Sequence, residues 1–151
     1  MTQPALTTIL VGTDGSTDST RAVEFAASLA AQAGAAVVLV HAMTLLEHLP
    51  DVTATGDGTR EGLEALLATD WSEPLRAAGV EYRTMLDDGP PLLVVPRVAD
   101  AVDADLIVVA THGRGYANGL IMGSTCHGLL QVAEQPVTVV PTRRAERPSS
   151  G

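Results

Sequence analysis

Basic and cysteine residues are scarce in this chain of 151 residues, and each shortage excludes a class of protein. Nine arginines, with no lysine, stand against eighteen aspartates and glutamates, so the formal net charge is −9. Non-specific nucleic-acid binding needs a basic surface, and we therefore expect no nucleic-acid partner. The single cysteine, Cys126, excludes an intramolecular disulfide and a cysteine-based zinc site.

Long apolar runs and an export signal are also missing. No stretch reaches the roughly 18 apolar residues that cross a membrane, and residues 1–8 lack the basic start of a signal peptide. We therefore expect a cytoplasmic protein with no membrane partner. The chain length favours one domain, which we place at residues 1–142, followed by a disordered polar tail at residues 143–151.

Aromatic residues make up only 3% of the chain, whereas hydrophobic residues make up 46%. The core must therefore consist of Ala, Val, Leu and Ile, which suits a parallel sheet covered by alanine-rich helices. Buried strands are expected at residues 9–11, 37–40 and 106–109, and further strands at residues 80–86 and 137–140.

Helices are expected between these strands. Apolar residues at helical spacing predict one helix ending at Gly34 and another along residues 63–75, closed by Gly79. Gly89-Pro-Pro91 opens a third helix, in which Pro96 predicts a kink or a late start, and a fourth covers residues 124–133. Regular alternation predicts an α/β fold with a doubly wound five-stranded parallel sheet and helices on both faces. Its strand order, 2-1-3-4-5 or 3-2-1-4-5, stays open at this point.

The most informative segment is a glycine-rich loop that runs from Thr111 to Gly123, directly before Ser124. It joins a buried strand to a helix start, where backbone N–H groups attract anions such as phosphate. Neither the P-loop pattern nor the dinucleotide-binding fingerprint fits it. The alternative is an ordinary strand–helix loop with Ser124 as its N-cap, and Arg114 either contacts a phosphate or lies in solvent.

Asp14 follows the first strand and is a second candidate binding residue. Its carboxylate can accept hydrogen bonds from a ribose hydroxyl or an adenine amine, or it can simply stabilise a turn. If the strand order is 3-2-1-4-5, Asp14 and the glycine-rich loop face each other across one crevice. His112 lacks neighbours for a metal site, His41 is interpreted as structural or solvent-facing, and Cys126 as buried packing.

The spacing of the glycine-rich loop resembles a motif of the universal stress protein family. Ala110-Thr-His-Gly113, nine residues and then Gly123-Ser124 are similar to the family's G-x-x-G-x9-G-[S/T], with alanine in the first position. Residues 9–16, 105–114 and 135–140 resemble the family's first, fourth and last strands, so the likeness covers about residues 6–142. The resemblance implies strand order 3-2-1-4-5.

The resemblance also implies a function. The expected protein binds an adenine nucleotide (ATP, AMP or cyclic AMP, with Mg²⁺ as a possible companion) and has a regulatory stress-response role with at most slow ATP hydrolysis. A homodimer through Val137–Val140 is implied as well. The alternative is a dimeric interaction module that binds no nucleotide. The nucleotide-binding residues carried over by position, backbone contacts included, are Thr13, Asp14, Ala42, Thr111, His112, Gly113, Arg114, Gly123, Ser124 and Thr125.

Overall fold

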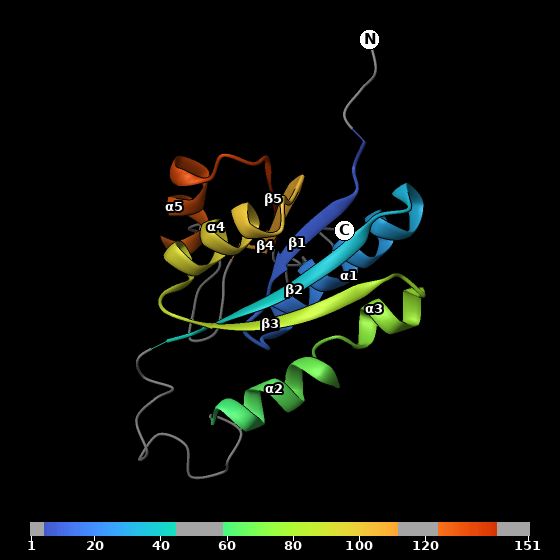
Figure 1. Ribbon diagram of the computed structural model, residues 1–151, viewed down its shortest axis with the longest axis horizontal. Coiled ribbons are helices and arrows are strands. Elements are labelled where there is room, and N and C mark those ends of the chain that lie inside the picture. Colours follow the sequence, from blue (N-terminus) through green and yellow to red (C-terminus); the bar gives the residue numbers. More distant parts are fainter. Residues whose placement is uncertain (1–4, 45–58, 112–123, 142–151) are drawn as a thin grey trace, which may run out of the picture.

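The computed structural model describes residues 5–44, 59–111 and 124–141, and Figure 1 shows how their elements are arranged. The five strands are all parallel, in the order β3-β2-β1-β4-β5. This confirms the doubly wound sheet and selects order 3-2-1-4-5. The strands are β1 Thr8–Gly12, β2 Ala36–Met43, β3 Tyr82–Asp88, β4 Leu106–Ala110 and β5 Val137–Val140, and the helices are α1 Thr17–Ala33, α2 Arg60–Ala68, α3 Glu73–Ala78, α4 Pro91–Ala101 and α5 Ser124–Val132.

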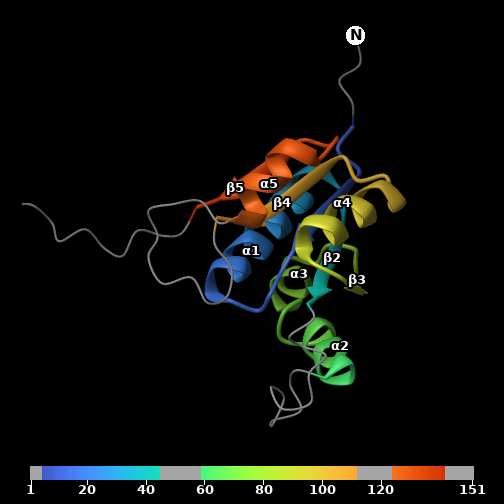
Figure 2. The ribbon, with the colours of Figure 1, turned by 90° about the vertical axis from the view of Figure 1, so that its left-hand side faces the viewer.

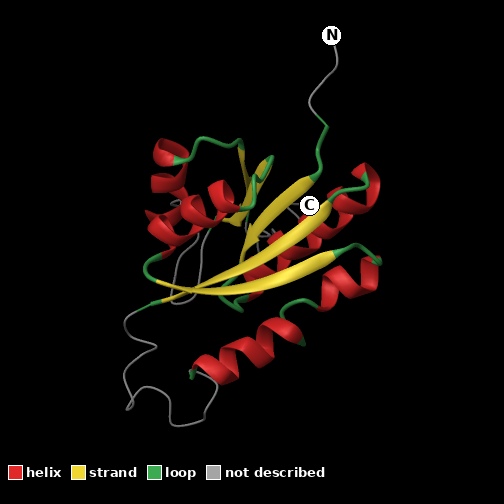
Figure 3. Cartoon of the chain, in the orientation of Figure 1, coloured by secondary structure: helices red, strands yellow, loops and turns green. Residues whose placement is uncertain are grey.

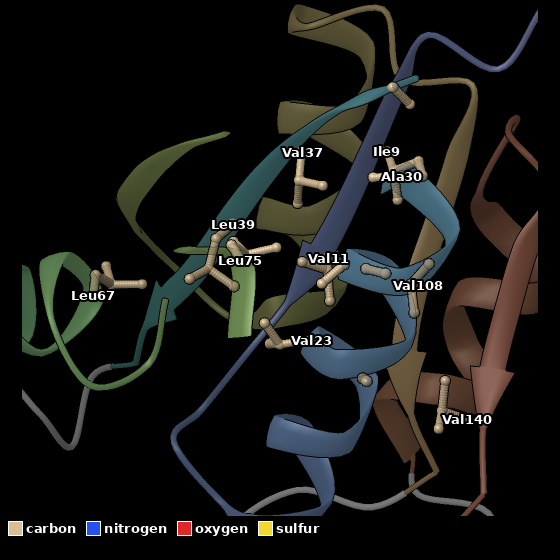
Figure 4. Close-up of a cluster of buried hydrophobic side chains, with 14 residues drawn as sticks. Ile9, Val11, Val23, Ala30, Val37, Leu39, Leu67, Leu75, Val108 and Val140 are labelled. Atoms are coloured by element: carbon tan, nitrogen blue, oxygen red, sulfur yellow. The ribbon is translucent and has the colours of Figure 1, made fainter. Parts of the chain in front are cut away.

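Each face of the sheet has its own hydrophobic core, because successive side chains of a strand point to opposite faces. Ile9 and Val11 belong to the core beneath α1, α2 and α3, part of which Figure 4 shows. Leu10 belongs to the other core, beneath α4 and α5. Figure 3 shows the helices on the two sides of the sheet. The α1 face is covered by alanines, as the low aromatic content predicts; they are Ala22, Ala26, Ala27 and Ala30.

The ends of α1 follow the sequence pattern. Ser16 is the N-cap, and its side chain accepts a hydrogen bond from the Ser19 amide. Gly34 ends the helix in the left-handed conformation, with φ of 70°. Both ends are therefore defined by local hydrogen bonds and backbone conformation.

One helix prediction is wrong, and one of the two alternatives for the next helix is excluded. The helix expected along residues 63–75 is divided into α2 and α3 by an elbow at residues 69–72. Pro96 predicted a kink or a late start in the next helix, and the late start is excluded because α4 begins at Pro91 and passes through Pro96. Burial of Val95 and Val98 on the same helix offsets the hydrogen bond that Pro96 cannot donate. Within the described residues, no helix is long and apolar enough to cross a bilayer.

Arg76 holds the elbow together from its outer side. Its Nη1 donates to the Ala68 carbonyl oxygen at 3.0 Å, to Ser72 Oγ at 2.7 Å and to Tyr82 Oη at 3.1 Å. Its Nη2 donates to the Thr69 carbonyl oxygen. The guanidinium thus satisfies carbonyl groups at the end of α2 and ties them to the start of β3. The hydrogen bond from Arg76 also lowers the pKa of Tyr82.

Candidate functional site

The sheet opens between β1 and β4 at its carboxyl edge. The register of these two strands ends with Val11 opposite Val108. Beyond that point, the Thr13 amide donates to the Val40 carbonyl oxygen in β2 at 2.9 Å. The Thr111 amide donates instead to the Val140 carbonyl oxygen in β5 at 3.0 Å. The two strands therefore turn to opposite neighbours, and this is the switch point where doubly wound sheets hold ligands.

The turn after β1 places Asp14 at this opening. Asp14 Oδ1 accepts a hydrogen bond from the Ser16 amide at 2.9 Å, so the turn role considered for this residue is real. Thr13 Oγ1 lies 3.1 Å from Ser19 Oγ and accepts from the Gly15 amide at 3.2 Å. The backbone around Asp14 is thus set by short-range hydrogen bonds. A carboxylate fixed in this way can still accept further hydrogen bonds, since each oxygen has two lone pairs.

The end of β2 contributes Ala42 and His41. Ala42 is buried, pairs in register with Asp87 of β3, and directs its side chain into the core beneath α4 and α5. His41 is buried on the opposite face, and its Nδ1 lies 2.8 Å from the Thr13 carbonyl oxygen. Because a carbonyl only accepts, Nδ1 is the protonated nitrogen in this contact. The structural interpretation of His41 is confirmed, and the solvent-facing one is wrong.

The other side of the opening is formed by β4 and the start of α5. Thr111 Oγ1 donates to the Val140 carbonyl oxygen at 2.9 Å, in addition to the bond from its amide. Ser124 and Thr125 are the first two residues of α5. Because α5 connects β4 to the parallel strand β5, its N-terminus lies at the carboxyl edge, where its positive end favours an anion. Four further predicted site residues lie outside the described residues: His112, Gly113, Arg114 and Gly123.

Comparisons with known proteins identify the family. The Universal stress protein family profile matches residues 6–141. The chain belongs to this family. The family member Rv2005c of Mycobacterium tuberculosis is 34% identical over 135 residues, which are 87% of this chain and 44% of that protein. The chain thus spans about half the length of the first curated relatives that it matches.

Solved structures of family members share the fold. A universal stress protein in complex with cAMP superposes with a TM-score of 0.72 at 29% identity, covering 93% of this chain and 100% of that one. The Archaeoglobus fulgidus family member in complex with dAMP gives a TM-score of 0.65 at 25% identity, covering 90% and 98%. These two relatives with the same fold were therefore solved with an adenine nucleotide bound.

The described part of the chain contains neither a metal cluster nor a reactive thiol. In the ranges that the structure describes, no group of three or more His, Cys, Asp or Glu side chains is arranged to hold a metal. Cys126, in the first turn of α5, is buried, as the sequence predicts. Burial raises the pKa of its thiol, which disfavours the nucleophilic thiolate.

The sequence analysis did not predict the contact between Trp71 and His41. Its indole ring packs edge to face on the His41 ring, with centroids 5.2 Å apart and an interplanar angle of 71°. Its helical spacing from Leu67 and Leu75 had indicated only a residue in an apolar stripe. The overlooked signal is Pro74, which marks a new helix start and so moves Trp71 into a turn.

Proposed function

We propose that this protein binds an adenine nucleotide in the opening between β1 and β4, as a regulatory stress-response protein. The observation that carries the proposal is the switch point itself, with the fixed Asp14 carboxylate on one side and the N-terminus of α5 on the other. The relatives solved with cAMP and dAMP support an adenine nucleotide as the ligand class.

The proposed contacts divide between the two sides. Asp14, Thr13 and the backbone of Ala42 would hold adenine and ribose through hydrogen bonds to the carboxylate and to main-chain groups. Ser124 and Thr125 would hold phosphate through the amides at the start of α5. The remaining proposed contacts come from Thr111, His112, Gly113, Arg114 and Gly123.

ATP, AMP and cyclic AMP are all candidate ligands, and Mg²⁺ would accompany the triphosphate. The acidic balance of the chain, with its net charge of −9, disfavours the most highly charged ligand. We propose at most slow hydrolysis, because a fast phosphoryl transfer needs a metal and a positioned base. We also propose that the protein acts in the cytoplasm.

The test is calorimetric titration with ATP, AMP and cyclic AMP. Asp14→Asn should weaken binding at least tenfold, because the neutral amide is a poorer acceptor than the carboxylate. Asp103→Asn is the matched control: it removes the same charge at the amino edge, and asparagine tolerates the φ of 53° found there. Its affinity should stay within twofold of the original protein.

A second substitution addresses the phosphate side. Gly123→Asp should abolish binding, since a carboxylate at the helix start repels phosphate. Absence of heat and of a thermal shift with all three nucleotides would exclude the proposal. It would leave the second candidate, an interaction module that binds no nucleotide.

We propose a homodimer through Val137–Val140, on the observation that β5 is the edge strand of the sheet. The carbonyl oxygens of Pro136 and Val140 accept hydrogen bonds from the β4 side of the strand. Successive residues of a strand direct their backbone groups to alternate sides, so the Val139 amide faces away from β4. Val139→Pro therefore removes one amide from the outer edge and none from the ladder with β4. Light scattering should show a monomer with nucleotide affinity retained; a persistent dimer would place the interface elsewhere.

A further inference from the structure

The turn that carries Asp14 is covered by the indole ring of Trp71. Trp71 belongs to the elbow between α2 and α3, whose place beside β3 is visible in Figures 1 and 2. A Cβ added to Gly15 would lie 2.4 Å from Trp71 Cζ2 and 2.8 Å from its Nε1. Distances this short mean that the ring lies directly on the Cα of Gly15, with no room between them.

Asp14 is held from both of its neighbours in the chain. On one side, His41 Nδ1 donates to the Thr13 carbonyl oxygen at 2.8 Å. On the other, Trp71 covers Gly15. The two aromatic rings also contact each other, with centroids 5.2 Å apart. Thr13, His41, Trp71 and Gly15 therefore form a closed circuit of contacts around the backbone of Asp14.

The elbow that presents Trp71 is itself firmly held. The Trp71 amide donates to the Leu66 carbonyl oxygen at 2.9 Å, and the ring packs against the core beneath α1. The next residue, Ser72, is fully buried and accepts a hydrogen bond from Arg76. The elbow therefore fixes the backbone that carries the ring, and the core supports the ring where it restricts the turn.

We propose that Trp71 and His41 are positioning residues, which hold the Asp14 carboxylate in the geometry that an adenine nucleotide requires. The proposal rests on the proposed function and adds two residues to it that act through Asp14. A binding group that is already fixed loses less conformational freedom on binding, so the rings raise affinity without touching the ligand. The contacts of Trp71 on Gly15 and of His41 on Thr13 carry the proposal.

The decisive measurement is the Kd for AMP of Trp71→Leu, which keeps an apolar side chain and removes the ring. We expect the Kd to rise at least tenfold and to recover partly in Trp71→Phe, which restores a ring. Tyr82→Phe is the matched control, because it removes a hydrogen bond on the outer side of the same elbow. Its Kd should stay within twofold of the original protein.

A double-mutant cycle tests whether Trp71 acts through Asp14. In the Asp14→Asn background, Trp71→Leu should add less than a twofold change, because the group that it positions is already altered. A purely structural role would give the same tenfold loss in both backgrounds. Equal, independent losses would overturn the proposal, as would a folded Trp71→Leu protein with the original affinity.

Fluorescence gives a readout that needs no variant. Trp71 is the only tryptophan of the chain, so the tryptophan emission reports the surroundings of this one ring. Saturating AMP should leave the emission maximum nearly unchanged, because the ring already lies on Gly15 in the free protein. A large shift of the maximum with a midpoint at the calorimetric Kd would mean that the ring moves on binding, which would overturn the positioning role and leave the proposed function intact. Absence of calorimetric binding in the original protein would instead overturn the proposed function, and with it this extension.

Discussion

The strands β1 and β4 are joined at the amino edge of the sheet and part at its carboxyl edge. At the amino edge, Asp105 Oδ2 accepts from the Thr7 amide at 2.9 Å, from Thr7 Oγ1 at 2.8 Å and from the Thr8 amide at 3.0 Å. The Asp105 amide returns a bond to the Thr8 carbonyl oxygen at 2.8 Å. At the carboxyl edge, the register of the same strands ends at Val11 and Val108.

Along this pair of strands, the contacts at the amino edge contribute to stability, whereas the opening at the carboxyl edge is the proposed binding site. The amino edge uses its polar groups to bind the two strands to each other. At the carboxyl edge, the side chains of His41 and Thr111 hold the ends of β1 and β4 toward β2 and β5. The contrast predicts that changes at the amino edge lower stability alone, whereas changes at the carboxyl edge also lower affinity.

Among these variants, Gly15→Ala at the carboxyl edge should cause the largest loss in the free energy of unfolding. Gly15 has φ of 79°, and the new Cβ would collide with the Trp71 ring. The strained backbone and the overpacking together should lower the free energy of unfolding by about 3 kcal/mol or more. Urea denaturation measures this loss, and AMP affinity should fall with it.

A double variant separates the two causes. Trp71→Leu removes the ring that the new Cβ meets but leaves the φ of Gly15 unchanged. Gly15→Ala should therefore cost less in the Trp71→Leu background than in the original protein. An identical cost in both backgrounds would show that backbone strain alone accounts for it.

Asp105→Ala should have the next largest effect, at the amino edge. The variant removes the acceptor of three partly solvent-exposed hydrogen bonds, so we expect a loss of about 1–2 kcal/mol in the free energy of unfolding. AMP affinity measured on the folded protein should be unchanged. Weakened binding would show that the two edges are coupled and would break the comparison.

The same carboxylate predicts a dependence on acid. Hydrogen bonds from the Thr7 amide, the Thr7 hydroxyl and the Thr8 amide lower the pKa of Asp105. Its contribution is therefore complete above the ordinary aspartate pKa of about 3.9, and it is lost as pH falls through the lower folded-state pKa. Below about pH 4, the stability difference between the original protein and Asp105→Ala should shrink. A difference that stays constant to pH 2 would contradict this assignment.

The smallest effect is expected for Gly128→Ala in α5. The added Cβ would meet Leu92 Cδ1 at 2.7 Å, but this is the far end of a flexible side chain with 37% exposure. The gain in helix propensity, up to about 1 kcal/mol, should offset the displacement of Leu92. Thermal unfolding should show little change or a small gain, and AMP affinity should hold. A large loss would mean that α4 and α5 are packed more rigidly than this contact indicates.

Most of the fold could be predicted from the sequence because buried parallel strands appear as continuous apolar runs. Residues 9–11, 37–40 and 106–109 all lie in strands, and Ser16 and Gly34 cap α1 as their residue types suggest. The elbow could not be predicted from periodicity. Leu67 and Leu75 are both buried and Trp71 partly so, and their four-residue spacing continues across a break in the backbone.

The site could be predicted only in part. Asp14 and Ser124 follow from local chemistry at a strand end and a helix start, and the structure places both at the carboxyl edge. Whether they bind a ligand remains a prediction. The contacts of His41 with Thr13 and of Trp71 with Gly15 link residues far apart in the chain. Such contacts depend on the packing of α3 beside α1, which no local pattern specifies.

The short ladder between β1 and β4 also has a mechanical consequence. Only Ile9–Val11 pair in register with Leu106–Val108, which divides the sheet into a three-stranded block and a two-stranded block. A ligand that contacts both β1 and β4 would link the two blocks. Tension applied in opposite directions along β1 and β5 would place the β1–β4 ladder under shear. Occupancy of the site would then appear as a higher unfolding force, even where the resting shape is the same.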